Sequence, residues 1–497
     1  TGVQTCALPI CGAAGADEAD GSDPAPAAPP APAESEPPAE RAYREAMAYD
    51  VHRDVAAMYY PWYANRETDG AWNEWNALGR RPPDDWASEY EPLLGLYSSR
   101  EPEVLEQHMQ WVRRAGIGTL IVAWFGPNSN DDAVRMVMQA AARYDIHVAL
   151  RIEGNIPGNP PLLPAAIRFL MREFASRPNY ARIASASPSN PQVTERPVIF
   201  VFAVDSMHDR WAAAMRTVRS RGDHPFVLAS GFDVRAVTEG GMDGIALGPI
   251  PTPEQGNYTE MRLLPYNAIV VPSITPGFAY FGDRSARESR LNGRQMDRQF
   301  EWALEAGTNP AMLVVTSFNR WSDGSQIEPV AQDTEESLDY GTLGPFGYLD
   351  KTREIAERFA RWEPPQRMRL RIEIENSSDW ADLVLERVDW GAARILQDGG
   401  PGTEAFFSWD ENLFVMNQPL LRARRGEEMD LIIQLQVPVT ESFQLGIAKG
   451  GLGEVDVDVI LLPSPGGPNR EQRIGECSLE EPPETADGRA WLTVRVR

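Results

Sequence analysis

Aromatic, carboxylate and amide side chains gather after the ends of several short apolar runs of this 497-residue chain. The candidates to contact a ligand are Tyr60, Trp62, Tyr63, Asp69, Trp124, Arg151, Glu153, Asn155, Asp205, Asn319, Arg320, Trp321, Asp323, Gln326 and Glu328. Flat aromatic faces pack against the C–H faces of a sugar ring, whereas carboxylates and amides hydrogen-bond to its hydroxyl groups. The pattern therefore predicts a carbohydrate site that takes a polysaccharide or an oligosaccharide.

Several of these residues have a second interpretation. Glu153 ends a strongly apolar strand, where an unpaired carboxylate is costly, and this favours a functional role. Asp205 either belongs to the site or caps the helix that follows it. Each tyrosine or tryptophan, taken singly, either faces a ligand or covers the core.

Neither a metal ion nor another cofactor is predicted. None of the five histidines stands at metal-ligand spacing from another, and no HExxH motif occurs. The chain also has no Gly-rich phosphate loop and no nucleotide-binding fingerprint.

The elements that must position the candidate residues alternate between strands and helices from residue 50 to residue 365. Continuous apolar runs predict parallel strands over Ala56–Trp62, Gly118–Phe125, His147–Glu153, Pro197–Val204, Phe226–Ser230, Gly244–Gly248, Ala268–Ile274 and Ala311–Phe318. Amphipathic periodicity predicts helices over Glu103–Ala115, Asp131–Tyr144, Pro164–Ala175, Arg210–Arg221, Arg294–Ala306 and Tyr348–Trp362. The alternation predicts an α/β fold, a (β/α)8 TIM barrel, in which ligands bind at the C-terminal ends of the strands. A doubly wound parallel sheet is the alternative, because the fifth and sixth helices are poorly marked.

After Pro364 and Pro365 the apolar period changes to about two. Strands are predicted over Met368–Glu375, Ala381–Val388, Met429–Val437, Ser442–Ala448, Val455–Leu462 and Ala490–Val496. Residues 366–497 are therefore expected to form a β-sandwich accessory domain. Its aromatic residues either bind sugar or, as we favour, fill the core between the sheets; they are Trp380, Trp390, Phe406, Phe407 and Trp409.

The first residues are read separately. Residues 1–10 resemble a translated sequencing adapter, and residues 11–49 form an acidic Pro/Ala-rich stretch that is expected to be a disordered tether. Cys11 at the start of that stretch either carries the lipid of a bacterial lipoprotein or is a chance residue of the linker. We expect a monomer that is extracellular, periplasmic or on the cell surface.

The charge balance excludes some partners. The chain has 47 basic and 72 acidic residues, a formal net charge of −25. Nucleic acids and anionic membrane surfaces both need clustered positive charge, so neither is expected as a partner. No apolar run is long enough to span a bilayer, which leaves a lipid on Cys11 as the one expected link to a membrane.

Several motifs over residues 55–362 resemble glycoside hydrolase family 99, the endo-α-1,2-mannosidases and endomannanases. They are Tyr59-Tyr60-Pro61-Trp62-Tyr63 with Asp69-Gly70, Pro82-Pro83-Asp84-Asp85, Tyr97-Ser98-Ser99-Arg100-Glu101-Pro102, Gly116-Ile117-Gly118, Pro272-Ser273-Ile274-Thr275-Pro276-Gly277 and Thr316-Ser317-Phe318-Asn319 running to Gln326-Ile327-Glu328-Pro329. The motifs stand in the order that the family has. The resemblance does not reach the C-terminal β domain.

The resemblance implies a (β/α)8 barrel that cleaves α-mannosidic bonds with retention. In that family one glutamate removes the proton of the sugar 2-hydroxyl and another protonates the leaving oxygen; both belong to the motif F-N-E-W-H-E-G-T-Q-I-E. Here Arg320 and Asp323 stand at those two positions. A guanidinium has no lone pair to accept a proton, and aspartate is shorter than glutamate by one methylene. The family's H-I-E-P-Y is likewise changed at Arg151 and Asn155, with Glu153 retained.

Two functions follow, and whether the chain is an enzyme stays open. In the first, it is a glycoside hydrolase of altered specificity with Asp323 as acid and Glu153 or Asp205 as base or nucleophile, and with Arg151 and Arg320 contacting an anionic glycan. In the second, it is a non-catalytic carbohydrate-binding surface protein on the same barrel.

Overall fold

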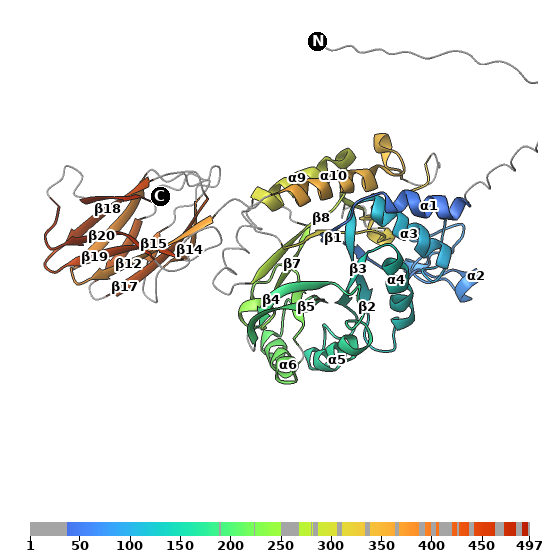
Figure 1. Cartoon of the computed structure of the whole chain (residues 1–497), viewed down its shortest axis with the longest axis horizontal. Helices are drawn as coiled ribbons and strands as arrows, with labels where there is room; N and C mark the ends of the chain where they lie inside the picture. The colour runs from blue at the N-terminus through green and yellow to red at the C-terminus, as the bar shows by residue number, and fades with distance from the viewer. Residues whose placement is uncertain are drawn as a thin grey trace, which may run out of the picture.

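The computed structural model describes a barrel part and a C-terminal β part. The described residues are 37–187, 190–222, 224–249, 268–279, 281, 287–305, 311–332 and 338–362 in the first part, and 367–386, 393–398, 404–406, 420–424, 427–436, 442–462, 472–483 and 490–495 in the second. Figure 1 shows both parts along the chain.

Parallel strands close into a barrel. They are β1 (His52–Tyr59), β2 (Ile117–Trp124), β3 (His147–Ile152), β5 (Asn190–Phe202), β6 (Phe226–Ser230), β7 (Gly244–Pro249), β8 (Ile269–Ile274) and β11 (Leu313–Val315). Each pairs in parallel with the next, and the pairings β3–β5 and β1–β11 close the ring. The predicted barrel is confirmed, and the alternative of an open doubly wound sheet is wrong.

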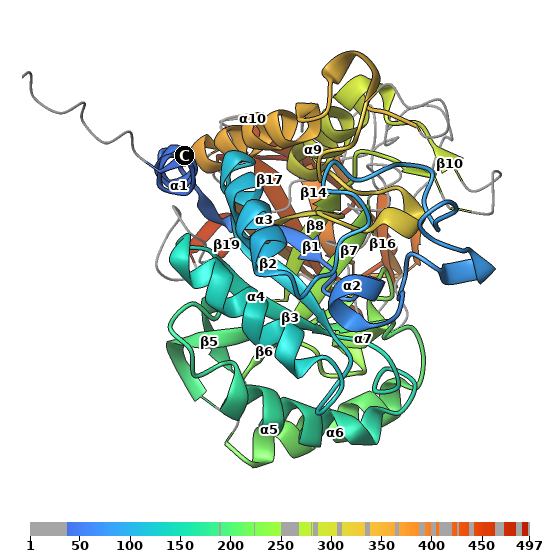
Figure 2. The same ribbon diagram turned by 90° about the vertical axis from the view of Figure 1, so that its right-hand side faces the viewer.

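Helices cover the outside of the barrel (Figures 1 and 2). They are α3 (Pro102–Arg114), α4 (Asp131–Arg143), α5 (Leu163–Glu173), α6 (His208–Ser220), α9 (Arg294–Glu305) and α10 (Gly347–Arg361). Each buries an apolar stripe; in α3, Leu105, Met109 and Val112 face the strands at helical spacing. The fifth connection holds only α7 (Arg235–Thr238), a single turn, which explains its weak sequence signal.

Alternation along the strands divides the barrel part into two cores. In β1, Val55, Ala57 and Tyr59 pack toward the helices. Ala56, Met58 and the next residue, Tyr60, pack inside the barrel. Because successive side chains of a strand point to opposite faces, neighbouring residues of one motif have different surroundings.

Shorter elements lie in the connections. They are α2 (Arg66–Asp69), η1 (Ala77–Gly79), η2 (Pro160–Leu162), β4 (Arg182–Ser187), β9 (Phe278–Ala279), β10 (Arg287–Glu288), η4 (Leu291–Gly293), η5 (Trp321–Asp323) and η6 (Gly341–Leu343). The sequence analysis did not predict β4. This strand pairs antiparallel with the first half of β5 and is not one of the parallel strands that close the barrel.

Helix α1 (Pro38–Met47) corrects the expectation of a disordered tether up to residue 49. Ala46 is buried, the Tyr43 ring meets Tyr144 edge-on at 5.2 Å, and Arg113 donates a hydrogen bond to the Ala46 carbonyl at 3.0 Å. The Pro/Ala composition hid the helix, although proline is favoured in a first turn and alanine, glutamate and arginine are good helix formers. Residues 1–36, with Cys11, lie outside the described residues.

The C-terminal part contains two antiparallel five-stranded sheets. Their strands are β12 (Arg367–Asn376), β13 (Trp380–Glu386), β14 (Ala393–Asp398), β15 (Glu404–Phe406), β16 (Leu420–Arg424), β17 (Glu427–Gln436), β18 (Ser442–Gly450), β19 (Val455–Leu462), β20 (Gln472–Leu479) and β21 (Ala490–Arg495). The order is β14-β17-β12-β19-β20 in one sheet and β15-β16-β13-β18-β21 in the other, as expected of a β-sandwich. Trp390, Phe407 and Trp409 lie outside the described residues, and the side-chain surroundings of Trp380 and Phe406 are not described, so the role of these aromatics stays a prediction.

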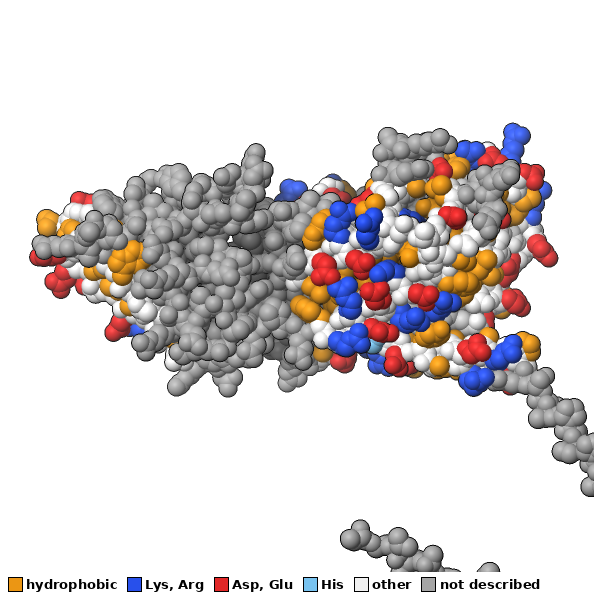
Figure 3. Space-filling model, turned by 90° about the horizontal axis from the view of Figure 1, so that it is seen from above, with side chains coloured by type: hydrophobic (Ala, Val, Ile, Leu, Met, Phe, Trp, Pro, Cys, Tyr) orange, Lys and Arg blue, Asp and Glu red, His pale blue; other side chains and the backbone are white. Residues whose placement is uncertain are grey.

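Positive and negative side chains are interspersed on the face of the barrel part seen in Figure 3. Helices α9 and α10 carry ion pairs of this kind, such as Lys351–Asp297 at 3.2 Å and Arg358–Asp297 at 3.7 Å. None of the described helices is both long and apolar enough to cross a bilayer.

Gly118 of β2 lies directly against the backbone of β1, and its substitution tests how closely these two strands pack. A Cβ atom on this residue would lie 2.4 Å from the His52 carbonyl oxygen and 2.7 Å from the Arg53 nitrogen. Because both are backbone atoms of β1, they cannot move aside. We expect Gly118→Ala to lower the free energy of unfolding by roughly 3 kcal/mol, measured by urea denaturation. Gly158→Ala is the control, since its Cβ would meet only the Asn155 oxygen at 3.8 Å; similar losses in both variants would contradict the packing argument.

Candidate carbohydrate site at the barrel mouth

Tyr60 marks the centre of the barrel mouth, and Asn319 fixes its position. The Tyr60 N–H donates to Asn319 Oδ1 at 2.8 Å, and Asn319 Nδ2 donates to the Tyr60 carbonyl at 3.1 Å. Asn319 is fully buried and joins the ends of β1 and β11. Its amide is therefore used within the protein, although the sequence analysis placed it among the ligand contacts.

Arg151 and Glu153 stand together at the end of β3, where their spacing of two puts them on the inner face of the barrel. Arg151 Nε and Nη2 donate to Glu153 Oε1 at 2.8 Å and 2.5 Å, and Nη2 also donates to the Tyr60 hydroxyl at 3.0 Å. Burial disfavours the charged arginine, but Tyr60 and Glu153 outweigh it and raise the pKa of Arg151. Glu153, whose carboxylate was expected from the sequence to need a partner, is therefore paired with Arg151.

Arg320 and Asp323 form a second ion pair on the η5 turn. Arg320 Nε lies 2.9 Å from Asp323 Oδ2. Asp323 Oδ1 accepts hydrogen bonds from the Ser325 N–H at 3.0 Å and from the Ser325 hydroxyl at 2.6 Å. Burial raises the pKa of Asp323, and the opposing effects of Arg320 and Ser325 are smaller.

Gly324 lets the chain turn sharply after this pair. Its φ of +64° is left-handed, and a Cβ there would lie 2.9 Å from the Ala279 nitrogen. Only glycine fits such a position without strain, which places Ser325 against Asp323.

Both guanidinium groups lie near the Tyr60 ring. The Cζ atoms of Arg151 and Arg320 lie 5.5 Å and 5.3 Å from the ring centroid, within cation–π range. We call Tyr60, Arg151, Glu153, Arg320 and Asp323 the Tyr60 cluster. The structure thus brings together both catalytic candidates and both arginines predicted from the sequence.

An aromatic surface adjoins the Tyr60 cluster. The half-buried Trp62 ring stacks on Tyr60 with centroids 4.5 Å apart, and Phe125 lies 5.9 Å from Trp62 on its other side. Phe202 is 43% exposed beneath the Arg151 guanidinium, at 5.0 Å. These rings can face a sugar.

The sequence analysis did not list Glu74, a half-buried carboxylate that interacts electrostatically with Arg320. Burial raises its pKa, while Arg320 lowers it to a smaller extent, so the two side chains are close enough to interact. Its φ of 65° is unusual for a residue with a side chain and belongs to the irregular stretch after α2. The sequence feature that could have indicated Glu74 is its position between Trp72 and Trp75.

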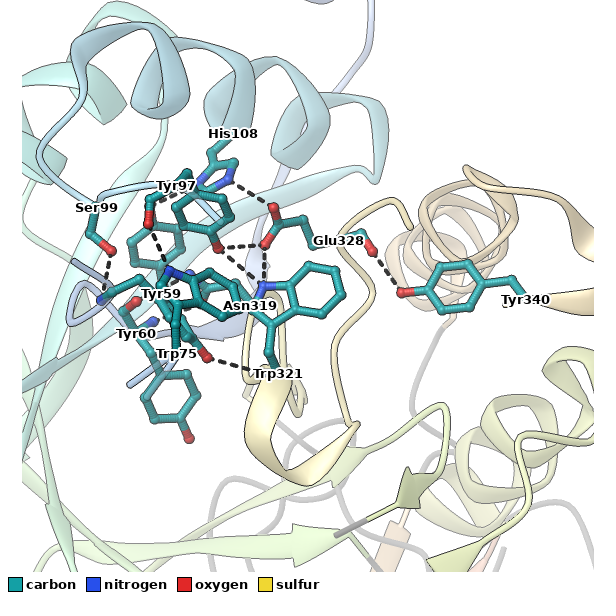
Figure 4. Close-up of polar contacts among 11 residues, drawn as sticks. Tyr59, Tyr60, Trp75, Tyr97, Ser99, His108, Asn319, Trp321, Glu328 and Tyr340 are labelled. Carbon is teal, nitrogen blue, oxygen red and sulfur yellow. Dashed lines mark hydrogen bonds and ion pairs between the residues drawn. The ribbon is translucent and has the colours of Figure 1, made fainter. Parts of the chain in front are cut away.

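Glu328 and Trp321 are fully buried in a network behind the mouth (Figure 4). Glu328 Oε2 accepts from the Tyr97 hydroxyl at 2.8 Å and from Trp321 Nε1 at 3.1 Å, and Oε1 lies 3.1 Å from His108 Nε2. His108 Nδ1 in turn lies 2.9 Å from the Tyr59 hydroxyl. In Figure 4 the Tyr60 ring points away from this network.

Tyr63 belongs to the same interior. It is 3% exposed, and its hydroxyl accepts a hydrogen bond from the Trp321 N–H at 2.9 Å. Its ring packs on Trp75 at 4.3 Å. Tyr63, Trp321 and Glu328 were predicted as ligand contacts, but their placement makes them supports of the η5 turn.

Two further candidates make contacts away from the Tyr60 cluster. Trp124 is fully buried, donates from Nε1 to Asp131 Oδ1 at 2.7 Å, and stacks on Phe169 of α5. Asp69 Oδ2 accepts from the Asn65 N–H at 3.0 Å and so closes the α2 turn. Neither side chain faces the cluster.

The remaining candidates differ in exposure. Gln326 is fully buried, and its side-chain amide has no hydrogen-bond partner in the described part of the chain. Asn155 and Asp205 are exposed on the loops after β3 and β5. Asp205 does not cap α6, whose N-cap is Met207; its Oδ1 lies beside Gly231 instead. The described residues contain no group of three or more His, Cys, Asp or Glu side chains that could hold a metal ion.

Glu328 should matter for stability. Glu328→Ala removes the acceptor of the Tyr97 hydroxyl and the partner of His108 Nε2, and leaves Trp321 Nε1 with the Tyr97 hydroxyl at 3.1 Å as its acceptor. We expect a loss of about 3 kcal/mol in the free energy of unfolding. Urea denaturation followed by tryptophan fluorescence measures it. The control is Glu357→Ala, which removes an exposed partner of Arg361; equal losses would contradict the structural role of the network.

The raised pKa of Asp323 should give stability a measurable pH dependence. Above the ordinary value of 3.8 the unfolded chain loses this proton while the folded chain still holds it. The contribution of Asp323 to stability therefore falls as pH rises through the folded-state pKa. We expect the melting temperature of Asp323→Asn, relative to wild type, to increase from pH 3.5 to pH 7.5; a difference that is constant or falls would contradict a raised pKa.

Comparison with known proteins agrees with this fold and with the motifs. The family model of glycosyl hydrolase family 99 matches residues 50–361. Glycoprotein endo-alpha-1,2-mannosidase of Mus musculus is 28% identical over 351 residues, which cover 61% of this chain and 74% of the mouse protein. The human glycoprotein endo-alpha-1,2-mannosidase-like protein is 27% identical over 360 residues, covering 63% and 77%.

A solved structure shares the fold. The GH99 endo-alpha-mannosidase of Bacteroides thetaiotaomicron superposes with a TM-score of 0.54 at 24% identity, and the match covers 63% of this chain and 98% of that one. The family model spans more than half of the chain and coincides with the barrel and its closing helix. The chain therefore belongs to glycosyl hydrolase family 99.

Proposed function

We propose that this family 99 member binds a neutral α-mannoside-type glycan at the barrel mouth without cleaving it by the family's reaction. The observation that carries the proposal is the ion pair between Arg320 and Asp323, 2.9 Å apart at the two positions where the family motif has glutamates. The mouse and Bacteroides thetaiotaomicron relatives are named endo-alpha-mannosidases and the human one is named endo-alpha-1,2-mannosidase-like, which supports the choice of glycan class.

Position 320 cannot supply a base. A guanidinium stays protonated at physiological pH and offers no lone pair to the proton of a sugar hydroxyl. Arg320 is instead held over Tyr60 and beside Asp323.

The carboxylates of the cluster are also engaged. A general acid must direct a proton at the leaving oxygen from about 2.6–3.2 Å. Asp323 has Arg320 on Oδ2 and both donors of Ser325 on Oδ1, and Glu153 has two donors of Arg151 on Oε1. Both oxygens of Asp323, at the position of the family's acid, are therefore engaged, whereas Glu153 Oε2 has no partner among the described residues. The engagement of Asp323 favours binding.

The charge balance of the cluster supports a neutral ligand. Arg151 pairs with Glu153 at 2.5 Å and Arg320 with Asp323 at 2.9 Å, so each arginine of the cluster has a carboxylate partner. No excess positive charge attracts an anion, so the anionic-glycan specificity considered from the sequence is not favoured. The half-buried Trp62 and the exposed Phe202 supply apolar faces for sugar C–H groups.

A second candidate function is hydrolysis with Asp323 as the acid and Glu153 as nucleophile or base. One observation favours it: burial raises the pKa of Asp323, as suits a group that must keep a proton near neutral pH. Placement outside the cytoplasm, a lipid on Cys11 and a monomeric state remain proposals that accompany either function.

Titration calorimetry with linear α-mannotetraose, combined with chromatography of the products, separates the two functions. We expect wild type to bind the sugar and release no fragments. Trp62→Ala should weaken binding about tenfold through loss of the stacking face, whereas Trp362→Ala, at the end of α10, should not. Fragments that appear with wild type and vanish with Asp323→Ala would contradict the binding proposal and establish hydrolysis.

A reversion tests the reason given for inactivity. The double variant Arg320→Glu, Asp323→Glu restores the carboxylates of the family motif, and we expect it to release fragments from yeast mannan. Release by wild type at the rate of the double variant would show that Arg320 does not block the reaction.

A further inference from the structure

The long connection between β1 and α3 encloses a second cleft. It has a volume of about 440 Å³, within the range of small-molecule sites, and its walls include Arg66, Glu67, Trp72, Trp86, Glu91 and Leu96. Members of the Tyr60 cluster are absent from its lining. The cleft lies between α2 and the stretch that leads to Leu96.

Two indole rings form part of the wall. Trp86 Nε1 donates to the Tyr90 carbonyl at 3.1 Å, which fixes this ring as a platform. Trp72 is half-buried, and its Nε1–H is enclosed without an acceptor in the part of the chain that the structure describes. An enclosed N–H without an acceptor is costly, so this donor indicates a missing partner.

Three charged side chains of the wall are accessible to a ligand. Arg66 and Glu67 are exposed and Glu91 is half-buried, and within the described residues none of them makes a side-chain hydrogen bond or ion pair. Asn65, in the same wall, differs: its amide donates to Glu101 Oε1 at 2.7 Å and accepts from the Thr68 N–H at 2.9 Å. The unengaged groups offer one set of donors and two carboxylates to a ligand.

We propose that this cleft is a second glycan-binding site, which takes a further neutral pyranose residue of the glycan held at the Tyr60 cluster. Indole faces receive the C–H face of the ring, the two carboxylates accept from its hydroxyls, and Arg66 donates to its oxygens. With one cation and two carboxylates, the cleft has no excess of positive charge that would favour an anionic sugar. The inference rests on the proposed function, because it assigns the same glycan to both sites.

The path of the chain brings the cleft wall near the η5 turn. Trp72 stands three residues before Trp75, whose ring lies 6.4 Å from that of Trp321, the neighbour of Arg320 in the sequence. Three residues span at most about 11 Å, so one short stretch runs from the cleft to the turn that carries part of the cluster. Linked sites of this kind strengthen binding of an extended ligand without new contacts at either site.

Calorimetric titration of the full chain with α-mannotetraose tests the proposal. We expect Trp72→Ala and Trp86→Ala each to weaken binding about tenfold. Glu91→Gln should weaken it about fivefold by replacing a charged acceptor; because Glu91 has no side-chain partner in the described chain, this variant should fold as wild type does. Trp362→Ala is again the control, and thermal melts check the folding of every variant.

The outcomes separate the two proposals. If wild type binds and the three cleft variants bind equally well while Trp62→Ala does not, the cleft proposal is overturned and the Tyr60 cluster stands. If the cleft variants lose binding and Trp62→Ala does not, the cleft is the glycan site and the function proposed for the mouth fails. If wild type does not bind the sugar, both proposals are overturned.

Discussion

The carboxylate of Glu328 is the interaction on which the barrel mouth depends. It lies fully buried and satisfies donors from three separate parts of the chain: Tyr97 of the first long connection, His108 of α3 and Trp321 of η5. A buried carboxylate is tolerable only with such partners. Removing one member of the network leaves the groups that were bonded to it buried without a hydrogen-bond partner, which destabilises the fold. Through Trp321 the network sets the turn that carries Arg320 and Asp323, so the geometry of the mouth follows from packing behind it.

At the mouth itself, charge is neutralised locally. Arg151 with Glu153 and Arg320 with Asp323 form two ion pairs, and both guanidinium groups lie within 5.5 Å of the centre of the Tyr60 ring. General acid–base chemistry needs a carboxyl group that points at the reacting oxygen and has a pKa near the working pH. Here Arg320 and Ser325 occupy both oxygens of Asp323, which suits binding, whereas burial raises the pKa of the same carboxyl group, as an acid would require.

The barrel could be predicted because long apolar runs and amphipathic repeats have periods that only strands and helices satisfy. The residue types of the site could be predicted from the sequence, but the direction in which each side chain points could not. Trp321 and Glu328 have the residue types of sugar contacts, yet they point into the interior. The need of Glu153 for a partner was evident from its burial, whereas Glu74 could not be foreseen, because its left-handed backbone follows no periodic pattern. Helix α1 was hidden by a composition typical of linkers.

The connection between β1 and α3 supplies the central tyrosine, its stacking neighbour Trp62 and both tryptophans of the second cleft. Much of the proposed ligand recognition thus comes from one continuous connection, whereas Arg320 and Asp323, at the positions of the family's glutamates, lie on the loop after β11. Evolution can therefore change the bound ligand without changing the residues of the reaction. A protein engineer could do the same by grafting this connection onto an active relative.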